Sequence, residues 1–310
     1  MEIAERMVHT GPGAGADAWT GFLAAPVHGS GIGVLVLAGS SGRIEEARCR
    51  LLAREGMTAL SVRWFGGPGQ PPGICEVPLE TFVSAAEWLR TAGARRIGVL
   101  GASKGAEAAL HLAGRHDGVD AVVALSPTSV TWANVGPGRD GAALPHRSSW
   151  TWRGRPLPFV PYDDTWTAAE PEGEPVSVLG WYEQSLPAFA ERVPAAAVPV
   201  GGAGTDLVLV AGGDDLMWPS LRFAAELAAR RRAAGLPVRL ITRPDAGHRP
   251  RLPGEGAAAP SGRFRYGGSP AADAALGADA WPHLLDALRG AGAGPVVEPS
   301  SAPQSQDSSK

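Results

Sequence analysis

One short stretch constrains the fold of this chain more than any other. Residues Ile97–Leu100 are apolar and β-prone, a Gly-x-Ser-x-Gly turn follows, and an Ala- and Leu-rich segment with helical character comes next. A strand, a tight turn and a helix in this order are typical of a nucleophile elbow, which holds its serine in a strained backbone conformation. Gly101 and Gly105 lack a β-carbon, so the strand and the helix can approach each other closely. The pattern predicts that the Ser103 hydroxyl stands at the carboxyl end of a buried strand.

The other predicted elements alternate around this stretch. Apolar runs that fit buried strands lie at 31–37, 57–62, 97–100, 119–125, 206–210 and 238–242, and a shorter strand is expected at 21–26. Segments with helical character lie at 45–55, 79–91, 219–234 and 277–288. Strands that alternate with helices predict an α/β protein with a mostly parallel sheet and helices on both faces. Ligands of such sheets bind at the carboxyl ends of the strands, where Ser103 is expected.

The sequence also suggests how the chain is divided. We expect a flexible N-terminal arm over 1–20, one catalytic domain over 21–290 and a disordered, Pro- and Ser-rich tail over 291–310. Within the domain, 126–197 breaks the alternation and is interpreted as an irregular Trp/Pro-rich insertion after the sixth strand, partly helical near 181–192. Its tryptophans could wall an apolar acyl pocket or form a small core of the insertion itself. They are Trp132, Trp150, Trp152, Trp166 and Trp181.

Composition excludes several classes of partner. The 310 residues carry a formal net charge of −3, which gives no general signature for binding nucleic acid. Cys49 and Cys75 make no disulfide framework and fit a reducing compartment. Residues 1–20 lack the basic and apolar regions of a signal peptide, and no window has the apolar length of a membrane span. We expect a cytoplasmic protein with no membrane span, no nucleic-acid partner and no metal or organic cofactor.

An acid and a base follow the serine in the order that α/β-hydrolases use. A serine hydroxyl needs a base within reach, and that base needs a carboxylate to orient it. His248 comes directly after the predicted strand at 238–242, and it alone among the seven histidines combines this position with the right chain order. Asp214 and Asp215 both follow the strand at 206–210; we favour Asp215 because many hydrolases show Gly-x-x-Asp-x-x-x-Pro at this point. Asp245 lies too close to His248 along a tight loop and is interpreted as a turn residue.

Backbone amides near the elbow are candidate oxyanion donors. The amide of Lys104 lies at a helix N-terminus, and a second donor is expected in the loop after 31–37, from Ser40 or, as the alternative, Ser41. The Lys104 side chain is expected to be solvated, with a phosphate contact at the mouth of the pocket as the alternative. Arginines could meet an anionic part of a substrate, although the sequence singles none of them out. The candidates are Arg43, Arg63 and Arg249.

Five motifs in order carry a family resemblance. They are GASKGAE at 101–107, GDDLMWPS at 213–220, PDAGH at 244–248, YGGSP at 266–270 and DAW at 279–281. Together they resemble the C-terminal catalytic domain of acyl-CoA thioesterases and bile acid-CoA:amino acid N-acyltransferases, from about Gly31 to Leu288. The resemblance implies the α/β-hydrolase fold and an acyl-enzyme mechanism on thioesters. It places Ser103, Asp215 and His248 at the positions of that family's triad.

Two departures from the family pattern shape the expected function. Larger members carry an N-terminal β-sandwich domain, for which the residues before Gly31 are too few. Members that conjugate amino acids use a cysteine nucleophile, whereas this chain has Ser103. Because a serine ester is less prone to aminolysis than a cysteine thioester, water is the expected acceptor.

The expected function is therefore that of a serine hydrolase acting on acyl thioesters linked to CoA or to a carrier protein. Two alternatives remain open at this point. The first is an acyltransferase or carboxylesterase acting on a small molecule, as in specialised metabolism. The second is a non-catalytic binding protein with a hydrolase fold.

Overall fold

The computed structural model describes residues 2–10 and 19–291 of the chain. The strands are β1 (Ile3–His9), β2 (Thr20–Pro26), β3 (Ile32–Leu37), β4 (Thr58–Arg63), β5 (Val77–Pro78), β6 (Arg96–Ala102), β7 (Ala121–Leu125), β8 (Trp150–Trp152), β9 (Arg155–Pro156), β10 (Asp206–Gly212) and β11 (Arg239–Arg243). The helices are α1 (Glu46–Arg54), α2 (Glu80–Thr91), α3 (Lys104–Ala113), α4 (Leu179–Ala188), α5 (Ser220–Ala233) and α6 (Pro270–Arg289).

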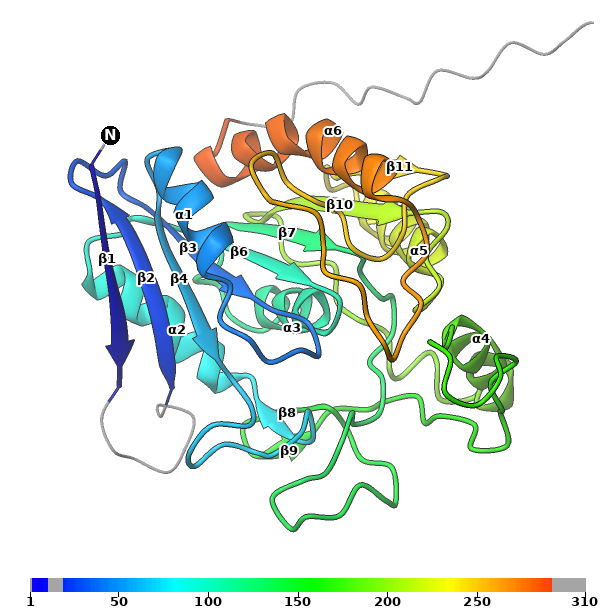
Figure 1. Ribbon diagram of the computed structural model, residues 1–310. Helices are drawn as coiled ribbons and strands as arrows, with labels where there is room; N and C mark the ends of the chain where they lie inside the picture. Colours follow the sequence, from blue (N-terminus) through cyan, green and yellow to red (C-terminus); the bar gives the residue numbers. More distant parts are fainter. Residues whose placement is uncertain (1, 11–18, 292–310) are drawn as a thin grey trace, which may run out of the picture.

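A single sheet organises most of the molecule. Its eight strands lie in the order β1-β2-β4-β3-β6-β7-β10-β11 (Figure 1). From β4 to β11 each strand runs parallel to its neighbours, while β2 pairs antiparallel with both β1 and β4. This is the mostly parallel sheet that the alternation of strands and helices predicts. The long segment after β7 follows the sixth strand of this sheet in chain order, once the edge strand β1, which was not predicted, is counted.

Both faces of the sheet are covered because its central strands are apolar on both sides. In β3, Leu35 and Leu37 pack into a core that includes α2, α3 and α5, whereas Val34 and Val36 pack into a second core with α1 and α6. Alternate side chains of a strand point to opposite faces, so an uninterrupted apolar run must be buried on both. Figure 1 shows α1 and α6 on one side of the sheet and α2 and α3 on the other.

The N-terminal arm is a correction to the sequence analysis. Residues Ile3–His9 form β1, which pairs with β2 from Ile3 opposite Pro26 to His9 opposite Thr20. Most of its side chains are exposed, so the strand carries little hydrophobic pattern, and its backbone pairing holds it at the edge. The remainder of the expected arm, at 11–18, and the expected tail beyond Ala291 lie outside the described residues. The domain boundaries stay a prediction.

The last helix begins earlier than expected, at Pro270 and not at Gly277. The Ser269 side chain accepts a hydrogen bond from the Ala272 amide, which caps the helix, and Pro270 follows in the first turn. Gly277 lies inside the helix, and the position has no room for a side chain because a β-carbon there would overlap the carbonyl oxygen of Arg251. A glycine that allows two backbones to approach was thus mistaken for a helix start.

The segment at 126–197 contains β8, β9 and α4, and it supplies most of a small apolar cluster that Trp218 and Phe223 complete. Trp132 stacks parallel to Tyr162 in this cluster, with ring centroids 5.8 Å apart. Trp166 and Trp181 pack against the same cluster, whereas Trp150 and Trp152 pack against the main core beside α2. These five tryptophans therefore serve as core residues.

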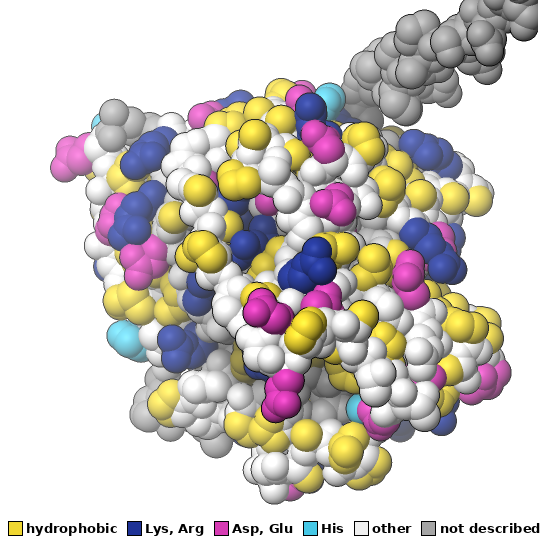
Figure 2. Space-filling view, turned by 45° about the vertical axis from the view of Figure 1, so that its right-hand side comes forward, with side chains coloured by type: hydrophobic (Ala, Val, Ile, Leu, Met, Phe, Trp, Pro, Cys, Tyr) yellow, Lys and Arg dark blue, Asp and Glu magenta, His cyan; other side chains and the backbone are white. Residues whose placement is uncertain are grey.

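The surface mixes charges of both signs. On the face drawn in Figure 2, the Lys and Arg side chains are interspersed with Asp and Glu side chains. In the parts of the chain that the structure describes, no helix combines the length and the apolarity needed to cross a bilayer. The expected cytoplasmic location stays a prediction.

Candidate active site

Ser103 lies between β6 and α3 in a backbone conformation that L-residues rarely adopt. Its φ is 55° and its ψ is −122°, a strain of about 1–3 kcal/mol. A β-carbon on Gly101 would overlap the Gly105 carbonyl oxygen, and one on Gly105 would overlap that of Ala38. The two glycines of the motif therefore allow strand, turn and helix to pack without a gap. The Ser103 amide is held by the Leu125 carbonyl of β7 at 2.9 Å.

His248 and Asp215 form a close pair at the same edge of the sheet. Nδ1 of His248 lies 2.8 Å from Oδ2 of Asp215, and the two side chains are only 5% and 2% exposed. The other oxygen of Asp215 accepts hydrogen bonds from the amides of Met217 at 2.8 Å and Trp218 at 3.3 Å. A carboxylate in this position can accept a hydrogen bond from Nδ1–H, and that tautomer leaves Nε2 of the imidazole free to accept a proton.

The competing acidic residues point elsewhere. The Asp214 carboxylate accepts the Gly268 amide at 2.7 Å. Asp245 is exposed and lies 3.2 Å from Arg243. Of the three candidate aspartates, Asp214, Asp215 and Asp245, it is Asp215 that contacts His248.

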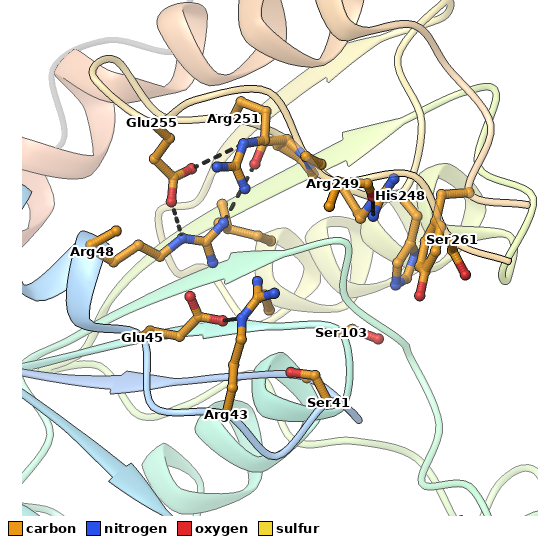
Figure 3. A pocket seen from close by; sticks show the side chains of 18 of the residues that line it. Ser41, Arg43, Glu45, Arg48, Ser103, His248, Arg249, Arg251, Glu255 and Ser261 are labelled. Carbon is orange, nitrogen blue, oxygen red and sulfur yellow. Dashed lines mark hydrogen bonds and ion pairs between the residues drawn. The ribbon is translucent and has the colours of Figure 1, made fainter. Parts of the chain in front are cut away.

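Ser103 and His248 line one cavity of about 700 Å³. It lies between the loop that leads from β3 into α1 and the loop that follows β11, at 248–261 (Figure 3). No hydrogen bond between the Ser103 hydroxyl and the His248 ring is found in the described part of the chain. Hydrogen bonds of this kind are often long before substrate binds. None of the five tryptophans considered above lines this cavity.

The candidate oxyanion donors lie beside Ser103. A β-carbon on Gly39 would stand 3.1 Å from Cβ of Ser103, so the loop that carries Ser40 approaches the serine closely. Lys104 begins α3, where the first amides of a helix have no partner within the helix. Among the described hydrogen bonds, neither the Ser40 amide nor the Lys104 amide acts as a donor. Their role in binding an oxyanion is a proposal.

The Lys104 side chain is a second correction, because it is buried and not solvated. It is 2% exposed, and Nζ lies 2.7 Å from Oε2 of Glu107, one turn along α3. The other oxygen of Glu107 accepts the Trp132 amide at 3.1 Å and the Trp150 indole N–H at 2.8 Å. Burial lowers the pKa of Lys104 and raises the pKa of Glu107, while their mutual attraction opposes both shifts. The segment at 126–197 buries the Lys104–Glu107 pair. The sequence around Lys104 does not show that a distant segment packs over it.

Asp273 is a site residue that the sequence analysis missed. Its Oδ1 accepts the Gly247 amide at 2.7 Å, directly before His248. Ser126 adds a second support, since its hydroxyl donates to the His248 carbonyl at 2.9 Å. Burial raises the pKa of Asp273. Aspartate is common in the first turn of a helix because it stabilises the helix N-terminus. The position of Asp273 in the sequence therefore did not indicate a role in the site.

The comparisons with known proteins decide the family. Residues 77–291 match the family model described as BAAT / Acyl-CoA thioester hydrolase C terminal. The chain belongs to this family. The resemblance carried by the five motifs is thereby confirmed.

Two curated relatives match over 262 residues, which is 81% of the chain. Identity is 25% to acyl-coenzyme A thioesterase 2, mitochondrial, of Mus musculus and 26% to acyl-coenzyme A thioesterase 1 of Homo sapiens. The match covers 53% of the first relative and 58% of the second, so the chain spans little more than half the length of either.

Solved structures confirm the α/β-hydrolase fold. A putative dienelactone hydrolase from Klebsiella pneumoniae superposes with a TM-score of 0.55 at 16% identity, covering 93% of this chain and 99% of that one. An acylaminoacyl peptidase from Pyrococcus horikoshii gives a TM-score of 0.54 at 13% identity, covering 79% of this chain and 38% of the peptidase. At such low identity these likenesses concern the fold alone.

Proposed function

We propose that this protein is a serine hydrolase that cleaves acyl thioesters through Ser103, His248 and Asp215. The observation that carries the proposal is the 2.8 Å contact between Nδ1 of His248 and Oδ2 of Asp215, at the edge of a cavity that Ser103 also lines. Membership in a family of acyl-CoA thioester hydrolases supports the thioester as substrate class.

The proposed mechanism uses the contact between Nδ1 of His248 and Oδ2 of Asp215, which turns Nε2 into the proton acceptor. Nε2 of His248 takes the proton of the Ser103 hydroxyl while the oxygen attacks the thioester carbonyl. The amides of Lys104 and Ser40 stabilise the oxyanion that forms, and loss of one such donor costs about 10²–10³ in rate. His248 then gives its proton to the leaving thiolate, and Ser103 keeps the acyl group as an ester. Water repeats the same steps on this ester and releases the free acid.

One experiment separates this proposal from its alternatives. The protein is treated with a fluorophosphonate, the modified residue is mapped by mass spectrometry, and thiol release from an acyl-CoA is measured in parallel. We expect an adduct on Ser103, and a Ser103→Ala variant should lose the adduct and at least about 10³-fold in kcat. Ser261→Ala, which changes another serine of the same cavity, is the matched control and should react and turn over like the wild type.

Other outcomes of this experiment would favour a different function. An amide formed when an amine is supplied would indicate acyl transfer, and activity on simple esters without activity on thioesters would indicate a carboxylesterase. A protein that forms no adduct and turns over neither substrate would be a binding protein, and the proposal would fail.

A further inference from the structure

The wall of the cavity carries more positive than negative charge. Five arginines and three glutamates line it: Arg43, Arg48, Arg50, Arg249, Arg251, Glu45, Glu46 and Glu255. Each glutamate has its own arginine, in the pairs Glu45 with Arg43 at 2.8 Å, Glu46 with Arg50 at 2.9 Å and Glu255 with Arg48 at 2.8 Å. Arg251 reaches Glu255 only at 3.8 Å. Two positive charges of the lining are therefore uncompensated.

Arg249 is the arginine of this wall without a carboxylate partner among the described residues. One of its terminal nitrogens donates to the Ala259 carbonyl at 2.9 Å, and its guanidinium lies 3.9 Å from the centre of the Tyr266 ring. Its Nε is buried and has no hydrogen-bond partner in the described part of the chain. Burial lowers the pKa of Arg249, the negative charges of Tyr266 and Asp273 oppose this shift, and the positive charges of Arg251 and Arg43 add to it. A partly buried cation that has no ion-pair partner among the described residues is stabilised by an anion that enters the cavity.

Arg43 comes from the opposite loop. Its guanidinium rises from the segment after β3 into the space below the Arg48–Glu255 pair (Figure 3). Arg43 donates a hydrogen bond to Glu45 through Nε. No described hydrogen bond uses the two terminal nitrogens of Arg43. These nitrogens form the planar donor fork that matches a carboxylate or a phosphate.

We propose that Arg249 and Arg43 form an anion subsite that binds an oxyanion carried by the substrate. Arg249 follows His248 directly, so the subsite adjoins the reacting centre and would orient the carbonyl toward Ser103. The oxyanion can belong to the leaving thiol, as a phosphate, or to the acyl group, as a terminal carboxylate. This inference rests on the proposed thioesterase function and names what its substrate must carry.

Three thioesters test the subsite and identify the source of the oxyanion. Butyryl-pantetheine is uncharged, butyryl-CoA carries phosphates on the thiol, and glutaryl-pantetheine carries a carboxylate on the acyl group. In Arg249→Gln and Arg43→Gln, kcat/KM for one of the charged substrates should fall about 10- to 100-fold relative to butyryl-pantetheine. A selective loss with butyryl-CoA assigns the oxyanion to phosphate, and a selective loss with glutaryl-pantetheine assigns it to carboxylate.

A matched control comes from the same wall. Arg50→Gln removes an arginine whose charge is already balanced by Glu5 and Glu46, so the ratio of charged to uncharged kcat/KM should stay as in the wild type. If Arg249→Gln and Arg43→Gln lower kcat/KM equally for all three substrates, these arginines only support the local structure and the subsite is refuted.

A binding measurement keeps the subsite testable if no thioester is cleaved. Calorimetric titration of the protein with CoA and, separately, with glutarate should show binding that weakens with added salt and is reduced in Arg249→Gln. If the wild type binds neither probe and shows no charge-dependent turnover, the anion subsite is wrong. If binding is seen without turnover, the hydrolase assignment fails while the subsite stands.

Discussion

Oδ1 of Asp273 accepts a hydrogen bond from the backbone amide of Gly247 at 2.7 Å. Because Asp273 lies in the first turn of α6, this bond ties the loop that carries His248 to the longest helix of the described chain. Gly247 itself has no room for a side chain, since a β-carbon would overlap the Gly267 carbonyl oxygen. The position of the imidazole therefore depends on α6 as well as on β11.

We predict that Asp273→Ala lowers both stability and turnover. The Gly247 amide would lose its acceptor in a buried environment, at a cost of about 1–3 kcal/mol in the free energy of unfolding. Asp273→Asn keeps an acceptor oxygen and should resemble the wild type in urea denaturation and in kcat. A loss of activity in Asp273→Asn equal to that in Asp273→Ala would argue that the charge, and not the hydrogen bond, matters.

Asp215→Asn should lower kcat by about 10⁴-fold, because an amide no longer holds the imidazole in the required tautomer. The neighbouring variant Asp214→Asn keeps an oxygen for the Gly268 amide and should change kcat by less than about tenfold. Steady-state hydrolysis of one acyl thioester by both variants is the measurement. The reverse ranking of the two variants would reassign the acid to Asp214.

The buried pair of Lys104 and Glu107 should show strong coupling. Glu107→Gln leaves the Lys104 ammonium buried without its counter-charge, and we expect a loss of about 3–5 kcal/mol in the free energy of unfolding. The double variant Lys104→Met/Glu107→Gln should be less destabilised than the sum of the two single variants, measured by urea denaturation. Additive losses would show that the two charges stabilise the fold independently.

His111 should make the protein sensitive to mild acid. Arg115 can only donate, so Nδ1 of His111 accepts its hydrogen bond at 2.9 Å, and the Nε2 proton faces Thr131 at 2.8 Å. The ring is therefore neutral, and burial, followed by the charge of Arg115, lowers the pKa of His111 well below 6.5. In the unfolded chain His111 keeps its ordinary pKa of about 6.5 and binds a proton more readily. The free energy of unfolding therefore falls as the pH drops below about 6.5, by at most about 1.4 kcal/mol per pH unit.

The measurement is the free energy of unfolding at pH 7 and at pH 5. The wild type should lose more stability between these values than His111→Gln, which has no proton to bind. His28→Gln, at an exposed turn position, is the control and should follow the wild type. An unchanged pH dependence in His111→Gln would contradict the prediction.

The order of elements and the place of the elbow were readable from the sequence because they depend on local patterns. Uninterrupted apolar runs such as β3 require burial on both faces, and glycines flanking Ser103 permit the tight turn. The start of α6 was misplaced because Gly277 marks a close approach between two backbones, which a linear sequence does not show. Edge strand β1 was missed because its side chains are mostly exposed and the pairing partner supplies its order.

The sequence by itself determined the alternation of strands and helices, the turn that carries Ser103, and the chain order of the acid and the base. Only the tertiary structure decided that Asp215 and not Asp214 meets His248, that Lys104 is buried against Glu107, and that Arg249 lines the cavity with no ion pair to a described carboxylate. The physical reason is the separation along the chain over which each effect acts. Backbone preference and hydrophobic periodicity act over a few neighbouring residues, whereas burial and the pairing of charges depend on segments that meet only when the sheet is formed.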